Sequence, residues 1–237
     1  MPYRVFADYH THTYYSHGKG SPRENVLAAI DKGLERVAVS EHGPGHFSFG
    51  VRGKKLERLN DELLGLRREF GGRIEVLRGL ELNVMGFGKS DCPADRDEYD
   101  VIIIGYHKSV PPTNRLALSV WGESLLHIKN DPHRNAEGIL AAAESCRANI
   151  ISHPNLYLRV DIPYMAECCR QLGILLEVNS ARVTLSEDEI RTIAGEGCGL
   201  IIGSDAHSPG RVGDFALAGE AVTKAEAWDS VVNAKKI

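Results

Sequence analysis

Short apolar runs rich in β-branched residues recur along the chain, and each is bounded by residues that favour turns. The runs are continuous and do not alternate with polar residues, which is typical of strands covered on both faces. Seven strands are predicted in this way, over residues 4–7, 37–40, 74–80, 101–105, 149–152, 174–178 and 199–203.

The segments between these runs carry helical patterns. Ser21, Pro22 and Glu24 form a capping box with proline in the first turn, and apolar residues then repeat on one helical face as far as residue 34. Further helices are predicted over residues 56–66, 135–147 and 186–194. Segment 86–99 is rich in Gly, Pro and Asp and is predicted to be a long loop, and segment 113–134 is a second candidate insertion.

Strands that alternate with helices favour a parallel sheet with right-handed crossover connections. Seven such units favour a barrel over an open sheet, because α/β barrels of about 200–250 residues form one domain. We therefore expect an α/β fold in which residues 1–237 form a single (β/α)7 barrel.

The composition narrows the class of protein. Hydrophobic residues make up 43% and charged residues 25%, and the 28 basic and 32 acidic residues give a net charge of −4, which excludes disordered, collagen-like and coiled-coil proteins. The apolar runs are far shorter than the roughly 18 residues that cross a membrane, so no membrane partner is expected. The negative net charge argues against a nucleic-acid partner. Five cysteines with no CxxC pair favour a reduced, cytoplasmic protein.

Side chains that bind metals follow six of the seven predicted strands. The carboxyl ends of parallel barrel strands meet at one rim, where such folds place their sites, so these side chains are expected to converge. Imidazole and carboxylate ligands without cysteine suit zinc, manganese or iron. The acidic and histidine residues that follow the strands are Asp8, His10 and His12, then Glu41 and His42, Glu81, His107, His153, and finally Asp205 and His207; His17 lies in a loop that can reach the same rim.

Each of these motifs has an ordinary structural interpretation when it is taken alone. His153-Pro154 is also typical of a turn after a strand, and Asp205 with His207 is also typical of a helix cap. The joint occurrence of the motifs at strand ends favours a metal site. His46 is a candidate for contact with substrate or with the ligands, whereas His127 and His133 are expected to be exposed or beside a helix, and Cys168-Cys169 to lie in the core.

Four of these motifs resemble those of the PHP (polymerase and histidinol phosphatase) family, and the resemblance extends over nearly the whole chain. The motifs are His10-Thr11-His12, Ser40-Glu41-His42, Gly105-Tyr106-His107 and Ser204-Asp205-Ala206-His207. The length and ligand set are most similar to the small stand-alone bacterial phosphatases of the YcdX type. Glu41 is a departure, since many relatives have Asp before the second-motif histidine.

The resemblance implies a distorted seven-stranded barrel that holds three divalent metal ions. It implies that His10, His12, Glu81 and Asp205 bind the first metal, that Glu81 bridges to a second metal bound by His107 and His153, and that His17, His42 and His207 bind the third.

The implied activity is hydrolysis of a small phosphate monoester, such as histidinol phosphate, by a hydroxide that bridges two metals. Glu81, Asp205 and His207 are the expected catalytic residues, and Arg182 and Arg211 are the candidate phosphate-binding arginines. Two alternatives remain open at this stage: a nuclease that cleaves phosphodiesters, and a metal-binding module without catalytic activity.

Overall fold

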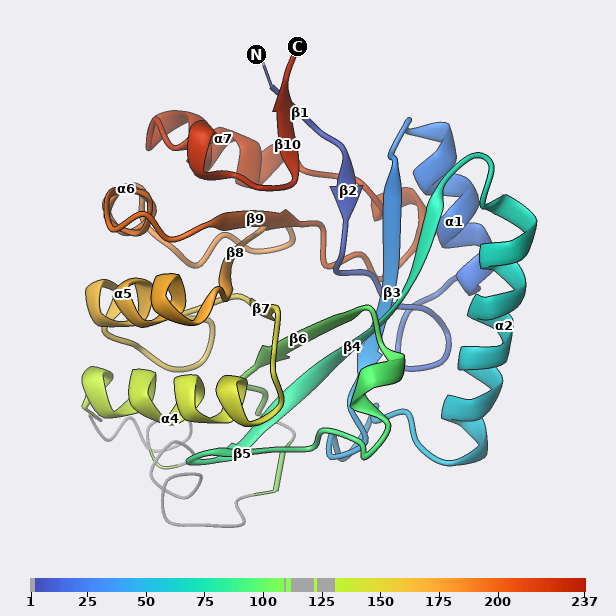
Figure 1. Cartoon of the computed structure of the whole chain (residues 1–237), viewed down its shortest axis with the longest axis horizontal. Coiled ribbons are helices and arrows are strands. Elements are labelled where there is room, and N and C mark those ends of the chain that lie inside the picture. The colour runs from blue at the N-terminus through green and yellow to red at the C-terminus, as the bar shows by residue number, and fades with distance from the viewer. Residues whose placement is uncertain (1–2, 109, 112–121, 123–130) are drawn as a thin grey trace.

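The computed structural model describes residues 3–108, 110–111, 122 and 131–237 (Figure 1). Seven strands pair in parallel in a single sheet, and each strand is paired to the next in chain order. They are β2 (Ala7–Asp8), β3 (Arg36–His42), β4 (Glu75–Gly86), β6 (Val101–Gly105), β7 (Ile150–Ile151), β8 (Leu175–Asn179) and β9 (Leu200–Gly203).

The first and last of these strands approach each other just beyond their carboxyl ends. Thr11 and Ala206 form a parallel bridge, and the His12 backbone N–H donates to the Ala206 carbonyl at 2.8 Å. The sheet is therefore a nearly closed barrel of seven parallel strands, which confirms the predicted fold class.

Two predicted strands have different limits in the structure. Segment 4–7 is divided: β1 (Tyr3–Val5) pairs antiparallel with β10 (Ala234–Lys236) outside the barrel, and only Ala7–Asp8 joins the parallel sheet. Strand β4 extends six residues past residue 80, so Glu81 lies inside a strand and does not follow one. The predicted loop 86–99 contains β5 (Lys89–Ser90), which pairs back onto β4, and the 3-10 helix η1 (Arg96–Glu98). Most of the predicted insertion 113–134 lies outside the described residues.

Helices cover the barrel in two sets (Figure 1). The helices α1 (Pro22–Asp31) and α2 (Lys54–Phe70) lie on the side of β3 and β4, and the helices α4 (Pro132–Ser145), α5 (Ile162–Leu172), α6 (Glu187–Gly195) and α7 (Ala216–Lys224) cover the remaining strands. The capping boxes at Ser21 and Ser186 are both present. Helix α7 lies outside the helices predicted from the sequence, and its N-cap residue Phe215 makes no side-chain cap.

The interior of the barrel changes from apolar to polar along the strands. Ala38, Leu77, Ile103 and Ile201 belong to a separate buried cluster within the barrel, whereas Ser40, Glu81 and Glu177 lie further along β3, β4 and β8 and are also buried. The polar side chains therefore collect at the carboxyl end of the strands. No helix in the described part of the chain is long and apolar enough to cross a membrane.

Candidate metal centre

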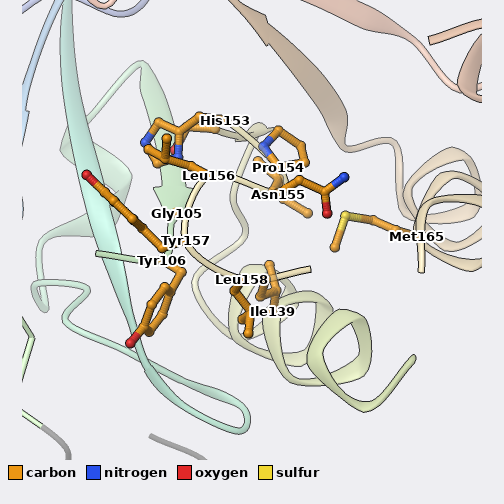
Figure 2. A pocket seen from close by; sticks show the side chains of 12 residues that line it. Gly105, Tyr106, Ile139, His153, Pro154, Asn155, Leu156, Tyr157, Leu158 and Met165 are labelled. Carbon is orange, nitrogen blue, oxygen red and sulfur yellow. The ribbon is translucent and has the colours of Figure 1, made fainter. Parts of the chain in front are cut away.

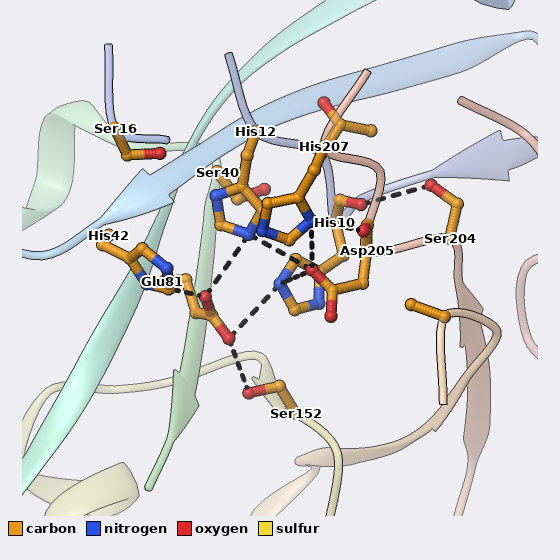
Figure 3. A network of polar contacts seen from close by, with 12 residues as sticks. His10, His12, Ser16, Ser40, His42, Glu81, Ser152, Ser204, Asp205 and His207 are labelled. Atoms are coloured by element: carbon orange, nitrogen blue, oxygen red, sulfur yellow. Dashed lines mark hydrogen bonds and ion pairs between the residues drawn. The ribbon is translucent and has the colours of Figure 1, made fainter. Parts of the chain in front are cut away.

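Glu81, on β4, lies among five histidines at the carboxyl end of the barrel, and its carboxylate is 1% exposed. Figure 3 shows His10, His12 and His42 beside it. Both oxygens face imidazole nitrogens, and Ser152 donates a further hydrogen bond to Oε1 at 3.1 Å. Oε1 lies 2.9 Å from His153 Nε2, 3.2 Å from His107 Nε2 and 3.3 Å from His10 Nε2, and Oε2 lies 3.0 Å from His42 Nδ1 and 3.5 Å from His12 Nε2.

Asp205 forms the opposite side of this cluster. Its Oδ1 lies 3.4 Å from His12 Nε2 and 3.6 Å from His10 Nε2. Asp205 (φ 48°) and His153 (φ 31°) both have left-handed backbone conformations, which are unfavourable for residues other than glycine and are found at functional sites. The turns after β9 and β7 therefore take strained conformations where they carry side chains of the cluster.

Three overlapping groups of side chains place their ligand atoms within 4.8 Å of one another. Two ligands of one zinc ion, each at about 2.0–2.2 Å, lie about 3–4 Å apart, so this spacing suits a metal ion. Within the described part of the chain, buried ring nitrogens of His10, His12 and His42 have no hydrogen-bond partner of good geometry. These unpartnered nitrogens and the two carboxylates fit divalent cations. The groups are His10, His12 and Asp205; His12, His42 and Glu81; and Glu81, His107 and His153.

His17 and His207 lie at the outer edge of the cluster and belong to none of these three groups. Their ring centroids are 4.2 Å apart, and those of His17 and His42 are 5.0 Å apart. The ring centroids of His207 and His12 are 4.7 Å apart. The structure thus brings all nine predicted ligands together, but it groups His42 with His12 and Glu81 more tightly than with His17 and His207.

The charges of the inner cluster stabilise one another. Burial alone would raise the pKa of Glu81 and of Asp205, but the neighbouring histidines, His10 foremost, hold both pKa values well below the ordinary range. Burial would lower the pKa of His12, but its contacts with Asp205 and Glu41 raise that pKa to about 9. The carboxylates of Glu81 and Asp205 are therefore ionised. They favour positive charge beside them, carried either by protonated histidines or by metal ions.

The pKa values of His17 and His42 are lowered, unlike that of His12. Burial, followed by the charge of His207, lowers the pKa of His17 to about 3. Burial also lowers the pKa of His42 to about 4, despite the nearby Glu81 carboxylate. Neutral imidazole is the form of histidine that binds metals, so these rings have the protonation state that a ligand requires.

Comparison of the sequence with models of protein families identifies a family for the chain. A family model of the PHP domain matches residues 8–181, which is most of the chain. The chain belongs to the PHP family.

Relatives of this PHP protein include two curated proteins that carry the name probable phosphatase. The protein from Shewanella sediminis is 25% identical over 240 aligned positions, which cover 94% of this chain and 87% of the relative. The protein from Citrobacter koseri is 28% identical over 227 positions, which cover 88% of this chain and 81% of the relative.

Solved structures with the same fold include two histidinol phosphatases. The histidinol phosphate phosphatase of Lactococcus lactis, in complex with zinc, L-histidinol and phosphate, has a TM-score of 0.59 and 17% identity over 92% of this chain and 94% of its own. A putative histidinol phosphatase from Listeria monocytogenes has a TM-score of 0.63 and 14% identity over 87% of this chain and 97% of its own. At these identities the likeness shows the fold alone.

The family match ends at residue 181, and two of the predicted ligands, Asp205 and His207, lie beyond it. Both residues nevertheless lie in the site, because β9 closes the barrel against β2 and so places the segment after β9 beside His10 and His12. The site is therefore assembled from both ends of the chain.

Glu177, on β8, is a site residue that the sequence-based prediction missed. Its Oε1 lies 2.7 Å from His10 Nδ1, and its Oε2 accepts hydrogen bonds from the His153 backbone N–H at 2.9 Å and from Asn179 at 3.0 Å. As a buried carboxylate, Glu177 accepts a hydrogen bond from the Nδ1–H of His10, which leaves the Nε2 lone pair of the neutral ring directed at the cluster. Gly203 makes room for it, since a Cβ there would lie 2.1 Å from Glu177 Oε1. The sequence did contain a signal for this residue, since Glu177 is a charged residue within the otherwise apolar run of β8.

Glu41 faces His12 at a longer distance and holds the loop after it. Glu41 Oε2 lies 3.6 Å from His12 Nδ1, and its Oε1 accepts the Thr13 backbone N–H at 2.8 Å. The hydroxyls of Thr13 and Ser16 also donate to this carboxylate. Glu41 therefore holds the segment that carries His17.

A cavity of about 190 Å³ opens over the cluster. Besides the candidate ligands, it is lined by His46, Phe49, Lys108, Leu156 and Tyr157. The Lys108 ammonium lies 4.9 Å from the centre of the Tyr157 ring. Behind His153 a second cavity of about 20 Å³ has room for roughly one water molecule and is too small for a substrate (Figure 2).

The structure does not bring the two candidate arginines to the cavity. Arg182 lines a separate surface groove beside Leu217, and Arg211 is paired with Asp214 at 2.7 Å. Both arginines lie in loops after strands, at the carboxyl end of the barrel where the cluster lies. Their side chains point to the surface groove and to Asp214 and do not line the cavity. Among the described residues, Lys108 is the one lysine or arginine that lines the cavity. It was missed because nothing in its local sequence distinguishes it from a surface lysine.

The remaining histidines and cysteines separate into buried and exposed positions. His46 is 4% exposed and lines the cavity. His133 is exposed in the first turn of α4 and contacts Asp161 at 2.9 Å, as expected for a residue beside a helix. His127 lies outside the described residues. Cys169 is fully buried and Cys168 is half-buried, and all five cysteines are free.

Proposed function

We propose that this PHP protein is a metal-dependent phosphatase that hydrolyses small phosphate monoesters at a centre of three divalent metal ions. The observation that carries the proposal is the set of three overlapping ligand groups around Glu81 and Asp205. Divalent ions held in such a site lower the pKa of a water molecule and neutralise phosphoryl oxygens.

The protein's own residues supply the ligands and their orientation. His10, His12 and Asp205 would hold one ion, and His107, His153 and Glu81 a second. We propose that Glu81 is shared between them, because its carboxylate also lies 3.3 Å from His10 Nε2 and 3.5 Å from His12 Nε2. For the third ion we propose His42 together with His17 and His207, because their rings surround the outer edge of the same cluster. In this proposal Glu81, Asp205 and His207 are the residues closest to the reacting phosphate.

The shape and charge of the cavity support a small substrate. Its volume of about 190 Å³ is below the 300–1,000 Å³ typical of sites for drug-sized ligands. A nuclease needs a basic groove with aromatic platforms along a strand, whereas the described lining offers one lysine and the aromatic rings of Phe49 and Tyr157. The names of the curated relatives and the histidinol and phosphate bound to the structural neighbour are in keeping with this proposal.

The test is a comparison of substrates on protein stripped with a chelator and reloaded separately with zinc, manganese or iron(II). Phosphate release is measured from histidinol phosphate, sugar phosphates and p-nitrophenyl phosphate, and cleavage from bis-p-nitrophenyl phosphate and a single-stranded oligonucleotide. We expect monoesters to be hydrolysed at least 100-fold faster than the diesters. Faster cleavage of the oligonucleotide would establish a nuclease, and a fully loaded protein with no activity would establish a binding module.

A pair of histidine variants, one inside the cluster and one outside it, tests the assignment of the site. His10→Ala removes a buried side chain of the cluster and is expected to abolish turnover. His133→Ala removes a histidine that is half exposed on α4 and should leave turnover unchanged. Equal activity in the two variants would refute the assignment of the site.

A further inference from the structure

His46 lies inside the cavity without belonging to any of the three ligand groups. Its ring stacks on His42, with centroids 4.5 Å apart and planes inclined by 21°. It meets the His107 ring edge to face, with centroids 5.8 Å apart. It therefore lies between histidines of two different ligand groups, one containing Glu81 with His12 and the other Glu81 with His153. A side chain at this point adjoins any substrate that spans both groups.

The hydrogen bond at one ring nitrogen fixes the role of the other. The Phe49 backbone N–H donates to His46 Nδ1 at 3.1 Å. A nitrogen that accepts a hydrogen bond carries no proton, so the proton of the neutral ring is on Nε2. Nδ1 is also unavailable to a metal, because its lone pair is already used. His46 thus differs from His10 and His12, whose buried nitrogens face Glu81 without a hydrogen bond.

The loop that carries His46 is held on several sides. The His46 backbone N–H donates to the Gly43 carbonyl at 3.2 Å, and its carbonyl accepts from Gly50 at 3.0 Å. The partly buried carboxylate of Asp91 accepts the Gly45 N–H at 2.8 Å. The ring is therefore fixed before a ligand arrives, which is what makes a hydrogen-bond donor effective in catalysis.

We propose that His46 contacts the substrate: its Nε2–H donates a hydrogen bond to a phosphoryl oxygen bound between His42 and His107. The proton stays on Nε2 throughout, so His46 acts by binding and orienting the phosphoryl group. The proposal rests on the phosphatase function proposed above and adds a residue that no ligand assignment includes. A donor aimed at a charged phosphoryl oxygen contributes roughly 10- to 100-fold in binding or rate.

Two amide substitutions separate this role from a structural one. In His46→Asn the amide oxygen occupies the place of Nδ1, so the bond from Phe49 is kept and the donor toward the cavity is lost. In His46→Gln the amide nitrogen occupies the place of Nε2, so the donor is kept and the bond from Phe49 is lost. The measurements on metal-loaded proteins are kcat/KM for a monoester, affinity for inorganic phosphate by calorimetry, metal content and Tm.

We expect the His46→Asn variant to lose 10- to 100-fold in kcat/KM and in phosphate affinity, with metal content and Tm unchanged. The His46→Gln variant should retain more of both. The reverse order, or a loss of bound metal in the Asn variant, would overturn the proposal by assigning His46 a structural or ligand role. If the wild-type protein hydrolyses no monoester but the Asn variant still binds phosphate more weakly, the proposed function fails and the contact stands. If the wild-type protein is active and the Asn variant matches it, the contact alone is refuted.

Discussion

Replacing Glu177 by glutamine changes the charge and the hydrogen-bonding pattern behind His10 while keeping the size of the side chain. The carboxylate accepts from three donors: His10 Nδ1 at 2.7 Å, the His153 backbone N–H at 2.9 Å and Asn179 at 3.0 Å. A glutamine amide has one accepting oxygen and one NH₂ group, so it cannot accept from both sides. One of the two sides must lose its hydrogen bond.

Either orientation of the amide disturbs the cluster. If the oxygen faces His10, the NH₂ group opposes the His153 N–H and loosens the strained turn that carries that histidine. If the NH₂ group faces His10, Nδ1 must become the acceptor and the proton moves to Nε2. The lone pair directed at Glu81 and Asp205 is then lost.

The expected cost follows from the behaviour of carboxylates that orient metal-binding histidines. Removal of such a partner lowers metal affinity about 10- to 100-fold, or ~1.4–2.7 kcal/mol of binding free energy. The assay is a competition between the stripped protein and a chromophoric chelator for zinc, with the Tm of the stripped protein recorded alongside.

Glu75→Gln is the matched control. Glu75 is half exposed near the amino end of β4, where it pairs with Arg36 at 2.7 Å, so the same change of charge there should leave zinc affinity within twofold. Wild-type zinc affinity in the Glu177→Gln variant would refute the argument that this carboxylate sets the His10 tautomer.

Three further predictions address the same cluster. Glu81→Gln should lower metal content at two ligand groups together, because the carboxylate is shared; elemental analysis that finds full occupancy would contradict this. Gly203→Ala should also lower zinc affinity at least tenfold, since its Cβ would collide with Glu177; unchanged zinc titration would show that the strand simply shifts. Burial lowers the pKa of His12 but neighbouring carboxylates raise it to about 9, so a metal must displace a proton below that pH. Zinc affinity should therefore rise between pH 7 and 9, and a flat profile in calorimetric titrations would argue against a protonated His12 in the free protein.

The strands could be predicted where their residues are buried on both faces. Strand β6 has the predicted limits because all five of its residues are buried. Segment 4–7 was divided differently because Tyr3–Val5 pairs with Ala234–Lys236 at the other end of the chain, a contact that no local pattern contains.

The site could be predicted to the extent that its residues follow strands. The nine candidate ligands converge, as inferred from their positions along the chain. Arg182 and Arg211 also follow strands, yet they do not reach the cavity, because the direction of a loop side chain depends on its contacts: Arg211 turns to Asp214. Lys108 lines the cavity without any pattern that distinguishes it from other surface lysines.

The sequence by itself determined the barrel and the histidines and carboxylates at its rim. Parallel strands bring their carboxyl ends to one edge, so the residues that follow each strand in the sequence meet there. The tertiary structure decided which nitrogen of each histidine faces the cluster. That choice depends on partners distant in sequence, such as Glu177 for His10, or on the fold of a single loop, such as the Phe49 N–H for His46. A hydrogen bond between residues 167 positions apart exists only once the barrel has formed.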